Sequence, residues 1–237
     1  MTDTIDIVIL NCNNNGVIQD CIQSIHRNTP GAYNLIVVDQ GSHDGSPEWL
    51  DTDGNVSHLI LNKRNKGVAE GRNQGIRAGR NPWVAIIDSD IIIKDPEWLD
   101  KMWNYTSDRA IGSIEARVKI HDWENGTWHF SGMAFCLIRR ECLQDIGIFD
   151  PVFFIGEDID WQARLEWSGW RTAFCPDTDI LHTCGQTMHG VLGHRYGELE
   201  RQRDMAIHFK YTPAFLERTV QQLGRRRRAK EIEMLIK

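Results

Sequence analysis

The chain has 237 residues, which is long enough for one sizeable hydrophobic core, and we expect one domain. Its formal net charge of −6 argues against a protein that binds nucleic acid over its whole surface. No apolar run approaches the roughly 18 residues of a membrane span, and no charged leader precedes an apolar segment at the N-terminus. We therefore expect a cytoplasmic protein without a transmembrane segment or a signal peptide.

The six cysteines have no C-x-x-C spacing, and several of them lie in apolar runs. Reduced thiols in the core of a cytosolic protein explain this pattern better than disulfides or a zinc site. We therefore predict that the cysteines are unpaired.

Short apolar runs alternate with helical patterns in the first half of the chain. The predicted strands cover residues 5–10, 35–38, 56–61 and 83–88, and the predicted helices cover residues 17–25, a short segment from Pro47, and residues 67–79. This alternation predicts a mostly parallel sheet. The right-handed crossover of the first unit places Asn11 and Asp39 at the same edge of that sheet.

Small residues recur between Gly67 and Gly79. They lower the helix propensity of this stretch, but they allow a helix to lie close to a sheet or a ligand. No G-x-G-x-x-G follows the first predicted strand, which disfavours a dinucleotide-binding domain, and a kinase-type phosphate loop is also absent.

The pattern changes in the second half of the chain. Strands are predicted at residues 111–118, 129–138, 171–175 and 180–182, and helices at residues 96–105, 139–146 and 157–167. A polar loop that contains tryptophans separates the first two of these strands. Beyond residue 194, charge-rich stretches with modest apolar faces predict further helices.

An acidic pair ends the fourth predicted strand, where Asp88 and Asp90 flank Ser89. Two carboxylates this close repel each other unless a positive charge lies between them, and hard cations bind oxygen ligands of this kind. The carboxyl ends of strands form the ligand site in an open α/β sheet. A metal-bridged diphosphate is therefore a suitable ligand, and a solvated acidic turn before the next helix is the alternative.

Further motifs occur in order along the chain: VILNCN at residues 8–13, VVDQGSHDGS at 37–46, NKGVA at 65–69, RNQG at 72–75, DSD at 88–90, LIRR at 137–140, IGIFD at 146–150 and GEDID at 156–160, followed by Arg164 and GWR at 169–171. This ordered set, over roughly residues 5–185, resembles family 2 glycosyltransferases of the GT-A fold. Cys12 stands where a tyrosine is common, Gln40 where an asparagine is usual, and Glu70-Gly71 where small or apolar residues are typical. These departures leave the donor sugar open.

The resemblance implies an α/β fold of the GT-A type. Such a fold has a Rossmann-like, mostly parallel central sheet flanked by helices, with a small antiparallel subregion on the acceptor side and C-terminal helices. We expect residues 1–188 to form the catalytic domain. Residues 189–237 are then a C-terminal helical extension packed on, or projecting from, the same domain.

The resemblance also implies a metal site at the acidic pair. Asp90 is expected to be the direct ligand, Asp88 to bind the ribose or a water of the metal, and His182 to supply another ligand. An oxygen-rich site with one imidazole suits Mn²⁺ or Mg²⁺ better than zinc. The alternative for His182 is a histidine that is hydrogen-bonded in a turn.

The catalytic residue implied by the resemblance is Asp158, with Glu157 beside it at the start of a helix. Inverting transfer requires a carboxylate that takes the proton from the acceptor hydroxyl, and Asp158 aligns with that base. The alternative is an ordinary acidic first turn, which is common at helix starts.

Contacts with the nucleotide sugar are expected from the sheet edge and the glycine-rich helix. Asp39, with Asn11 beside it, is expected on the base or the ribose, and Arg72 either reaches the diphosphate or holds Asp88. The alternatives are turn-forming roles for Asn11 and Asp39, and a purely structural ion pair for Arg72. The full expected set is Asn11, Asp39, Gly67, Arg72, Asn73, Asp88 and Ser89.

An acceptor platform requires exposed aromatic faces, because sugar rings stack on them. Trp123 and Trp128 lie in the polar loop and are the favoured candidates, and Trp161 is a further one. Core packing is the alternative for tryptophans outside that loop.

The predicted function is metal-dependent, inverting transfer of a sugar from a nucleoside diphosphate, with UDP favoured, to an acceptor hydroxyl. The acceptor is expected to be a saccharide, with a lipid-linked saccharide, a protein or a modified nucleic acid as alternatives. A binding module that has kept the fold without catalysis is a competing reading, and a nucleotidyltransferase is disfavoured because no glycine-rich basic loop follows the first strand.

The basic run from Arg225 to Arg228 leaves room for an anionic partner, such as nucleic acid or a membrane surface at which the protein would be peripheral. A solvated basic helix end explains the run equally well. The sequence sets neither the donor sugar nor the oligomeric state.

Overall fold

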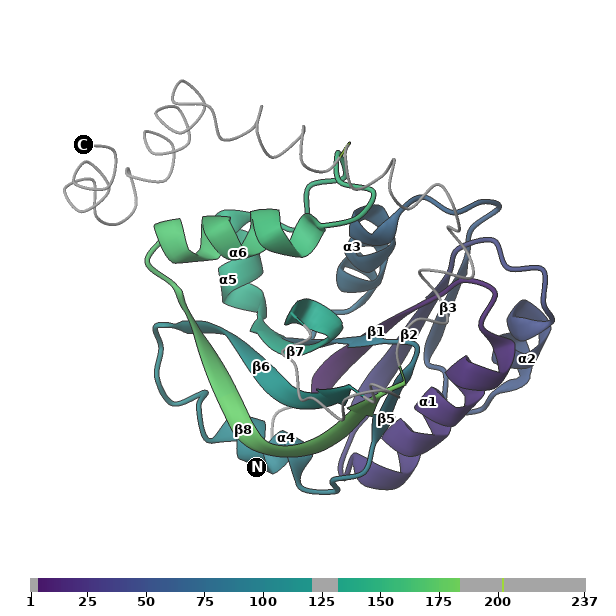
Figure 1. Cartoon of the computed structure of the whole chain (residues 1–237), viewed down its shortest axis with the longest axis horizontal. Helices are drawn as coiled ribbons and strands as arrows, with labels where there is room; N and C mark the ends of the chain where they lie inside the picture. The colour runs from purple at the N-terminus through teal and green to yellow at the C-terminus, as the bar shows by residue number, and fades with distance from the viewer. Residues whose placement is uncertain (1–3, 121–131, 184–201, 203–237) are drawn as a thin grey trace.

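The structure, a computed structural model, describes residues 4–120, 132–183 and 202, and an eight-stranded sheet forms the centre of this part (Figure 1). The first half contains β1 (Ile5–Asn11), α1 (Asn15–Asn28), β2 (Tyr33–Asp39), α2 (Ser46–Thr52), β3 (His58–Leu61), α3 (Val68–Ala78) and β4 (Trp83–Asp88). The second half contains β5 (Ile91–Ile93), α4 (Trp98–Trp103), β6 (Ile111–Ile120), a 3₁₀ turn (Gly132–Ala134), β7 (Phe135–Arg139), α5 (Arg140–Ile146), α6 (Glu157–Trp167) and β8 (Arg171–His182).

One half of the sheet is parallel. The strand order is β3-β2-β1-β4-β7-β6-β8-β5, and the first four strands all run in the same direction. Asn11 pairs with Asp39, and Leu10 pairs with Asp88, so the carboxyl ends of β1, β2 and β4 meet at one edge. This arrangement confirms that Asn11 and Asp39 share an edge.

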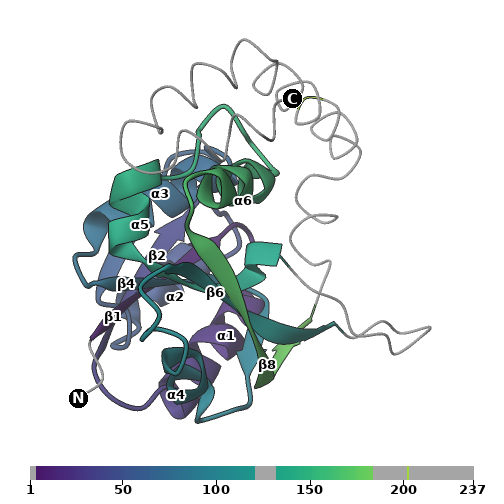
Figure 2. The ribbon, with the colours of Figure 1, turned by 90° about the vertical axis from the view of Figure 1, so that its left-hand side faces the viewer.

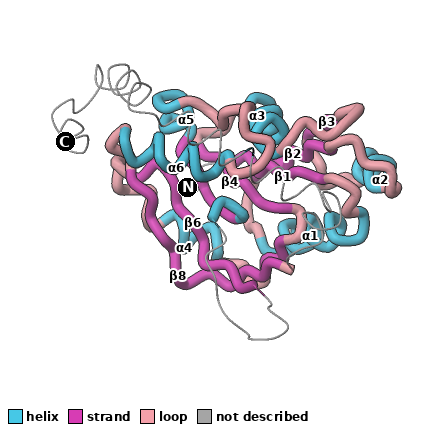
Figure 3. Tube along the Cα trace, turned by 45° about the horizontal axis from the view of Figure 1, so that its top comes forward, coloured by secondary structure: helices cyan, strands magenta, loops and turns pink. Residues whose placement is uncertain are grey.

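The other half of the sheet is mixed. β7 is antiparallel to both β4 and β6, β5 is antiparallel to β8, and β6 and β8 are parallel. Figure 3 shows β6 and β8 side by side, on the opposite side of the molecule from β2 and β3. The structure therefore has the predicted α/β architecture, with a parallel region of four strands joined to a mixed region of four strands that contains the antiparallel pairs.

Helices cover both faces of the sheet, with α3, α5 and α6 on one face and α1 and α4 on the other (Figure 2). Alternate residues of a strand point to opposite faces. In β1, accordingly, Ile7 and Ile9 belong to the core on the α1 side, while Val8 lies on the other face against Gly75 of α3. On the α1 side, the fully buried Trp98 of α4 meets the ring of Phe135 edge-on at 5.0 Å.

The glycines of α3 bring this helix close to the sheet, as predicted. A Cβ atom on Gly75 would lie 2.3 Å from Cγ1 of Val8, and one on Gly71 would lie 2.2 Å from Nε2 of Gln40. Both distances are far shorter than a van der Waals contact. Only glycine therefore lets α3 pack at its observed distance from β1 and β2.

Two features differ from the expected elements. β5 was not predicted, because a run of three isoleucines is too short to show a period and its pairing partner lies in β8, far along the chain. Residues 171–182 form one strand instead of two, with a shift in the pairing register against β6 between Ala116 and Val118. The continuous strand matters because it carries His182 to β5.

Three further expectations concern the cysteines, a membrane-spanning helix and the C-terminal residues. Every cysteine among residues 4–183 that the structure describes is buried with a free thiol, as predicted, whereas Cys184 lies outside the described residues. None of the described helices is long and apolar enough to cross a membrane. The proposed boundary at residue 188, the C-terminal helices and the run from Arg225 to Arg228 also lie outside the described residues.

Candidate active site

The acidic pair lies where β4 gives way to β5. Asp88 is the last residue of β4, and Ser89 and Asp90 form the turn before Ile91. Ser89 is buried, and its Oγ accepts a hydrogen bond from Nδ2 of Asn14 at 3.1 Å. The turn is thus fixed against the start of α1.

Pairing of β5 with β8 places His182 beside Asp90. Ile91 pairs with His182, and both N and Oγ1 of Thr183 donate to the carbonyl oxygen of Asp90 at 3.0 Å. Nε2 of His182 then lies 2.9 Å from Oδ1 of Asp90. One ligand atom from each of Asp88, Asp90 and His182 lies within 4.8 Å of the others, so these residues could hold a metal ion.

The chemistry of this donor set fits a hard divalent cation. Two carboxylates and one imidazole provide mainly oxygen ligands, which suits Mg²⁺ or Mn²⁺. Burial lowers the pKa of His182, but the hydrogen bond and charge of Asp90 raise it, and the net shift is upward. Burial raises the pKa of Asp88, Arg72 opposes that rise, and the nearby charge of Asp90 adds to it.

Arg72 of α3 joins the acidic pair to the start of α6. Its Nη2 donates to Oδ1 of Asp88 at 2.9 Å, and its Nη1 donates to Oε1 of Glu157. Burial raises the pKa of Glu157 to about 7, and the charge of Arg72 opposes this rise. The sequence offered an ion pair between Arg72 and Asp88 as one alternative, and the structure contains it.

Asp158 lies in the first turn of α6, directly after Glu157. Gly156, with φ +77°, precedes this turn in a left-handed conformation that suits glycine. Oδ1 of Asp158 accepts a hydrogen bond from N of Ile159 at 3.0 Å. Burial raises the pKa of Glu115 in β6, and the charge of Asp158 adds to the rise.

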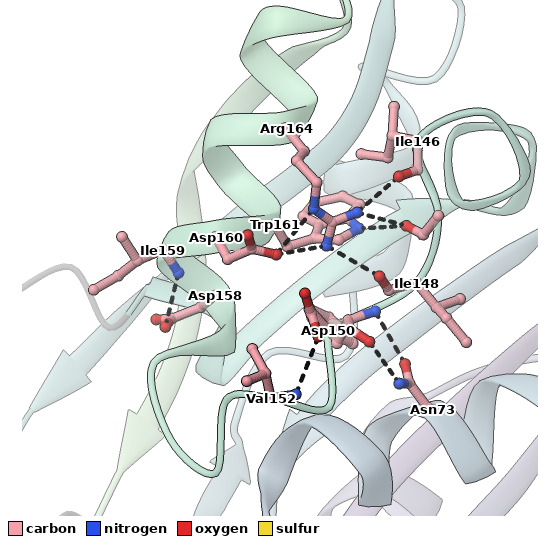
Figure 4. A network of polar contacts seen from close by, with 12 residues as sticks. Asn73, Ile146, Ile148, Asp150, Val152, Asp158, Ile159, Asp160, Trp161 and Arg164 are labelled. Carbon is pink, nitrogen blue, oxygen red and sulfur yellow. Dashed lines mark hydrogen bonds and ion pairs between the residues drawn. The ribbon is translucent and has the colours of Figure 1, made fainter. Parts of the chain in front are cut away.

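The loop between α5 and α6 is fixed by hydrogen bonds from Arg164 of α6. Arg164 pairs with the fully buried Asp160 at 2.9 Å and donates to the carbonyl oxygens of Ile146 at 2.7 Å and Ile148 at 3.0 Å (Figure 4). Asp158 lies apart from these contacts at the start of α6. The helix that carries Asp158 is therefore fixed at its far side by charge and hydrogen bonds.

Asn11 and Asp39 form a buried polar cluster at the sheet edge. Oδ1 of Asp39 accepts the N–H groups of Gly41 and Ser42, and Oδ2 accepts Nδ2 of Asn11 at 2.8 Å and Oγ of Ser42 at 2.6 Å. Nδ2 of Asn11 also donates to Oγ of Ser46 at 2.7 Å. Asp39 is 1% exposed, so the structure shows it shaping the loop after β2, and its contact with a nucleotide stays a prediction.

Asn73 and Trp161 are fully buried and make structural contacts. Nδ2 of Asn73 donates to O of Phe149 at 2.7 Å, and Oδ1 accepts N of Phe149 at 3.0 Å. Trp161 packs against Phe149 and donates from Nε1 to O of Gly147 at 3.2 Å. Burial therefore does not favour the predicted donor contact of Asn73 or the acceptor contact of Trp161. Trp123 and Trp128 lie outside the described residues.

Gly67 stands at the entrance to α3. Its φ of +87° is in the region that favours glycine, its N donates to Oδ1 of Asn65, and a Cβ would lie 2.9 Å from the ring of Phe154. These contacts explain why a glycine is required there. Its expected contact with a donor stays a prediction.

A model of the family described as glycosyl transferase family 2 matches residues 6–158, which is more than half of the chain. The chain belongs to this family. The matched residues of the family 2 domain run from β1 to Asp158 and include Asp88 and Asp90.

Two curated relatives of the chain are glycosyltransferases by name. The chain is 26% identical to the glycosyltransferase GlyG of Streptococcus pneumoniae serotype 4 over 153 residues, and this match covers 62% of this chain and 50% of GlyG. It is 22% identical to the glycosyltransferase AglE of Haloferax volcanii over 189 residues, and this match covers 70% of this chain and 62% of AglE. The chain thus spans only part of the length of these relatives.

Solved structures share the fold of the family 2 domain. The mannosyltransferase PcManGT from Pyrobaculum calidifontis, in complex with GDP-Man and Mn²⁺, has a TM-score of 0.69 at 18% identity, covering 92% of this chain and 68% of that chain. S. aureus TarS has a TM-score of 0.63 at 13% identity, covering 89% of this chain and 44% of that chain. These likenesses confirm the predicted GT-A-like fold.

Two residues of the family 2 domain were not foreseen as part of the site. Gln40 is 3% exposed, donates from Nε2 to O of Gly67 at 2.8 Å and accepts N of Lys66 at 3.2 Å, so it ties β2 to the loop before α3. Glu115 lies on β6 and is half-buried, and the charge of Asp158 adds to the rise of its pKa that burial causes. The signal that could have found Glu115 is a single acid inside an apolar strand.

Proposed function

We propose that this chain carries the catalytic domain of an inverting glycosyltransferase, which moves a sugar from a nucleoside diphosphate to an acceptor hydroxyl. The observation that carries the proposal is the contact of Arg72 with both Asp88 and Glu157. Through Arg72, the candidate metal ligands and the turn with the candidate base belong to one contiguous site. Membership of glycosyl transferase family 2 supports the same activity.

Asp88, Asp90 and His182 would hold the metal ion, for which we propose Mn²⁺ or Mg²⁺. A cation bound there would neutralise the negative charge that develops on the leaving diphosphate. Support comes from the close approach of the three side chains and from the Mn²⁺ in the similar mannosyltransferase structure. His182 must be neutral to coordinate a cation, and a bound cation would take the place of the direct contact between its Nε2 and Oδ1 of Asp90.

Asp158 would act as the general base. A carboxylate oxygen of Asp158 takes the proton while the acceptor oxygen forms its bond to the anomeric carbon. The bond from that carbon to the diphosphate oxygen breaks, and its electron pair leaves with the diphosphate. Because the acceptor attacks from the face opposite the leaving group, the configuration at the anomeric carbon inverts.

For the donor we retain a UDP-sugar, as the sequence resemblance implies. GDP-mannose is the second candidate, because the similar mannosyltransferase was solved with GDP-Man. Selectivity between related sugars rests on a few contacts worth about 1–3 kcal/mol each, so donors must be compared directly. A saccharide is the proposed acceptor.

The test is thermal unfolding of the full chain with a panel of UDP-sugars and GDP-mannose, each with Mn²⁺, Mg²⁺ or EDTA. A ligand at about 100 times its Kd stabilises the native state by about 2.7 kcal/mol, which raises the melting temperature by several degrees. We expect stabilisation that requires both donor and metal and that EDTA removes. The substitution Asp90→Asn should abolish most of it. No metal-dependent stabilisation by any donor would contradict the proposal.

Catalysis separates an enzyme from a binding module. Asp158→Asn should still bind donor with metal but should lose roughly 100-fold or more in transfer, because the base is gone. Near-normal transfer by this variant would remove Asp158 from its role. Donor binding by the unmodified chain without transfer or donor hydrolysis would favour the binding module instead.

A further inference from the structure

Three segments that are distant in sequence meet at one guanidinium group. Arg72 comes from α3, Asp88 from the end of β4, and Glu157 from the start of α6. The side chains of Arg72 and Glu157 are 6% and 4% exposed, so both charges lie out of water. The guanidinium carbon of Arg72 also lies 5.7 Å from the ring centre of Phe149.

A buried charge is stable only when opposite charge and hydrogen bonds compensate it. The planar guanidinium group directs separate N–H groups to different acceptors, which a lysine ammonium does not do in the same fixed geometry. Here Nη2 donates a hydrogen bond to Asp88 and Nη1 donates one to Glu157. One positive charge is thus shared between two carboxylates, and weakening either pair must strengthen the other.

On the donor side, Arg72 binds Oδ1 of Asp88. The other oxygen of Asp88 accepts no hydrogen bond from the residues that the structure describes, and the side chain stays 36% exposed. Asp88 can therefore remain fixed by Arg72 while still offering an oxygen to a cation.

On the acceptor side, Arg72 fixes Glu157, the first residue of α6. Asp158 follows it, and within the described part of the chain its carboxylate accepts one hydrogen bond, from the neighbouring N–H of Ile159. Among residues 4–120 and 132–183, no other element donates a hydrogen bond to that carboxylate. Its position therefore depends on where the first turn of α6 lies, and the Arg72–Glu157 pair fixes the start of this turn while the Arg164–Asp160 pair fixes its other side.

We propose that Arg72 is a positioning residue that couples the candidate metal ligand Asp88 to the turn of α6 that carries Asp158. The coupling deepens the proposed function and rests on it for the role of Asp158. Its signature is that a change at Glu157, which is not among the candidate metal ligands, alters metal binding at Asp88.

The decisive variant is Glu157→Gln, which keeps the size of the side chain and can still accept a hydrogen bond from Arg72. It removes the charge that competes for Arg72, so Arg72 should hold Asp88 more strongly and reduce its attraction for a cation. We expect the Kd for Mn²⁺ alone, measured by calorimetric titration of the full chain, to rise by roughly three- to tenfold. We also expect kcat for transfer to fall by about tenfold or more with the KM for donor changed less.

Arg72→Lys is the second variant. A lysine keeps the positive charge but cannot reach both carboxylates in the same way, so it should lower kcat and change Mn²⁺ affinity together. The matched control is Arg140→Lys, because Arg140 also forms a buried pair, with the fully buried Asp6 at the amino end of β1. That control should lower the melting temperature without changing Mn²⁺ affinity.

Unchanged Mn²⁺ affinity in Glu157→Gln would overturn the coupling, and so would a wild-type chain that binds no Mn²⁺. If Arg72→Lys does not fold, Glu157→Gln decides the question alone. Failure of the proposed function looks different: the wild-type chain would bind Mn²⁺, and Glu157→Gln would shift that binding, while no donor supported transfer.

Discussion

Gly75 shows how one missing side chain sets the distance between a helix and the sheet. It lies in α3 directly over Val8 of β1, and there is no room for a Cβ atom between them. Because Arg72 lies on the same helix, the glycine also sets how far Arg72 stands from Asp88 and Glu157.

We therefore predict that Gly75→Ala destabilises the chain by about 1–3 kcal/mol, because the added methyl group overlaps Val8 and forces the helix outward. The matched control is Gly16→Ala in α1, where an added Cβ meets nothing within 4 Å. That change should be neutral or should stabilise by up to about 1 kcal/mol, since alanine favours a helix. Urea unfolding of both variants measures the difference. Equal midpoints would contradict the packing argument.

The ends of whole elements are tied by buried acids, and Asp95 before α4 is the clearest case. Oδ1 of Asp95 accepts N of Glu97 at 3.0 Å, and Oδ2 accepts Nζ of Lys101 at 2.8 Å and N of Asp179 at 3.3 Å. Burial tends to raise the pKa of Asp95, but Lys101 and the backbone N–H groups outweigh it and lower the pKa. One carboxylate thereby joins α4 to β8, the strand that carries His182.

Asp95→Asn should lower the free energy of unfolding by about 1–2 kcal/mol at pH 7, because it breaks the charged pair with Lys101. Since the folded-state pKa is below the unfolded value of about 3.9, the wild-type advantage is complete above that value and shrinks as pH falls through the folded-state pKa. Urea unfolding between pH 8 and pH 3 measures it. Asp100→Asn, at an exposed position of the same helix, is the control. A difference that disappears between pH 8 and pH 5 would contradict the assignment.

Across the molecule, the candidate site lies at the carboxyl ends of the parallel strands. A buried polar cluster around Asp6, here called the clamp, lies at their amino ends. Asp6, fully buried at the start of β1, accepts hydrogen bonds from Nδ2 of Asn34, from N and Nδ2 of Asn81, and from Nη2 of Arg140 at 2.7 Å. Arg140 starts α5, so the clamp joins the parallel region to the second half of the chain. Stability and chemistry are thus separated in space.

Asp6→Asn should destabilise the protein by about 3 kcal/mol, because it leaves the charge of Arg140 without its buried partner. At a temperature where the variant remains folded, kcat should match that of the wild-type chain. The control is Asp108→Asn, which breaks the exposed pair between Asp108 and Arg171 and should change the midpoint little. Chemical unfolding and transfer assays on the same samples measure both quantities. A folded Asp6→Asn variant with strongly reduced kcat would contradict the separation.

The sequence by itself determined the parallel half of the fold and the place of the acidic pair. Short continuous apolar runs predict buried strands, helical patterns predict the helices between them, and right-handed crossovers then bring Asn11, Asp39 and Asp88 to one edge. These features depend on local patterns and on a general rule of handedness. The ordered motifs also indicated the family, which the comparisons confirm.

Only the tertiary structure decided which charged and polar groups meet. Arg72 pairs with Glu157 across 85 positions of sequence, which no pattern indicated. The family resemblance had implied that Asp90 and His182 share a site, and the pairing of the unpredicted β5 with β8 is what brings them together across 92 positions. The burial of Asn73 and Trp161 likewise follows from how the 146–150 loop packs. Periodic patterns carry no information on such partners, since hydrogen bonds and ion pairs between distant segments depend on how the elements are placed together.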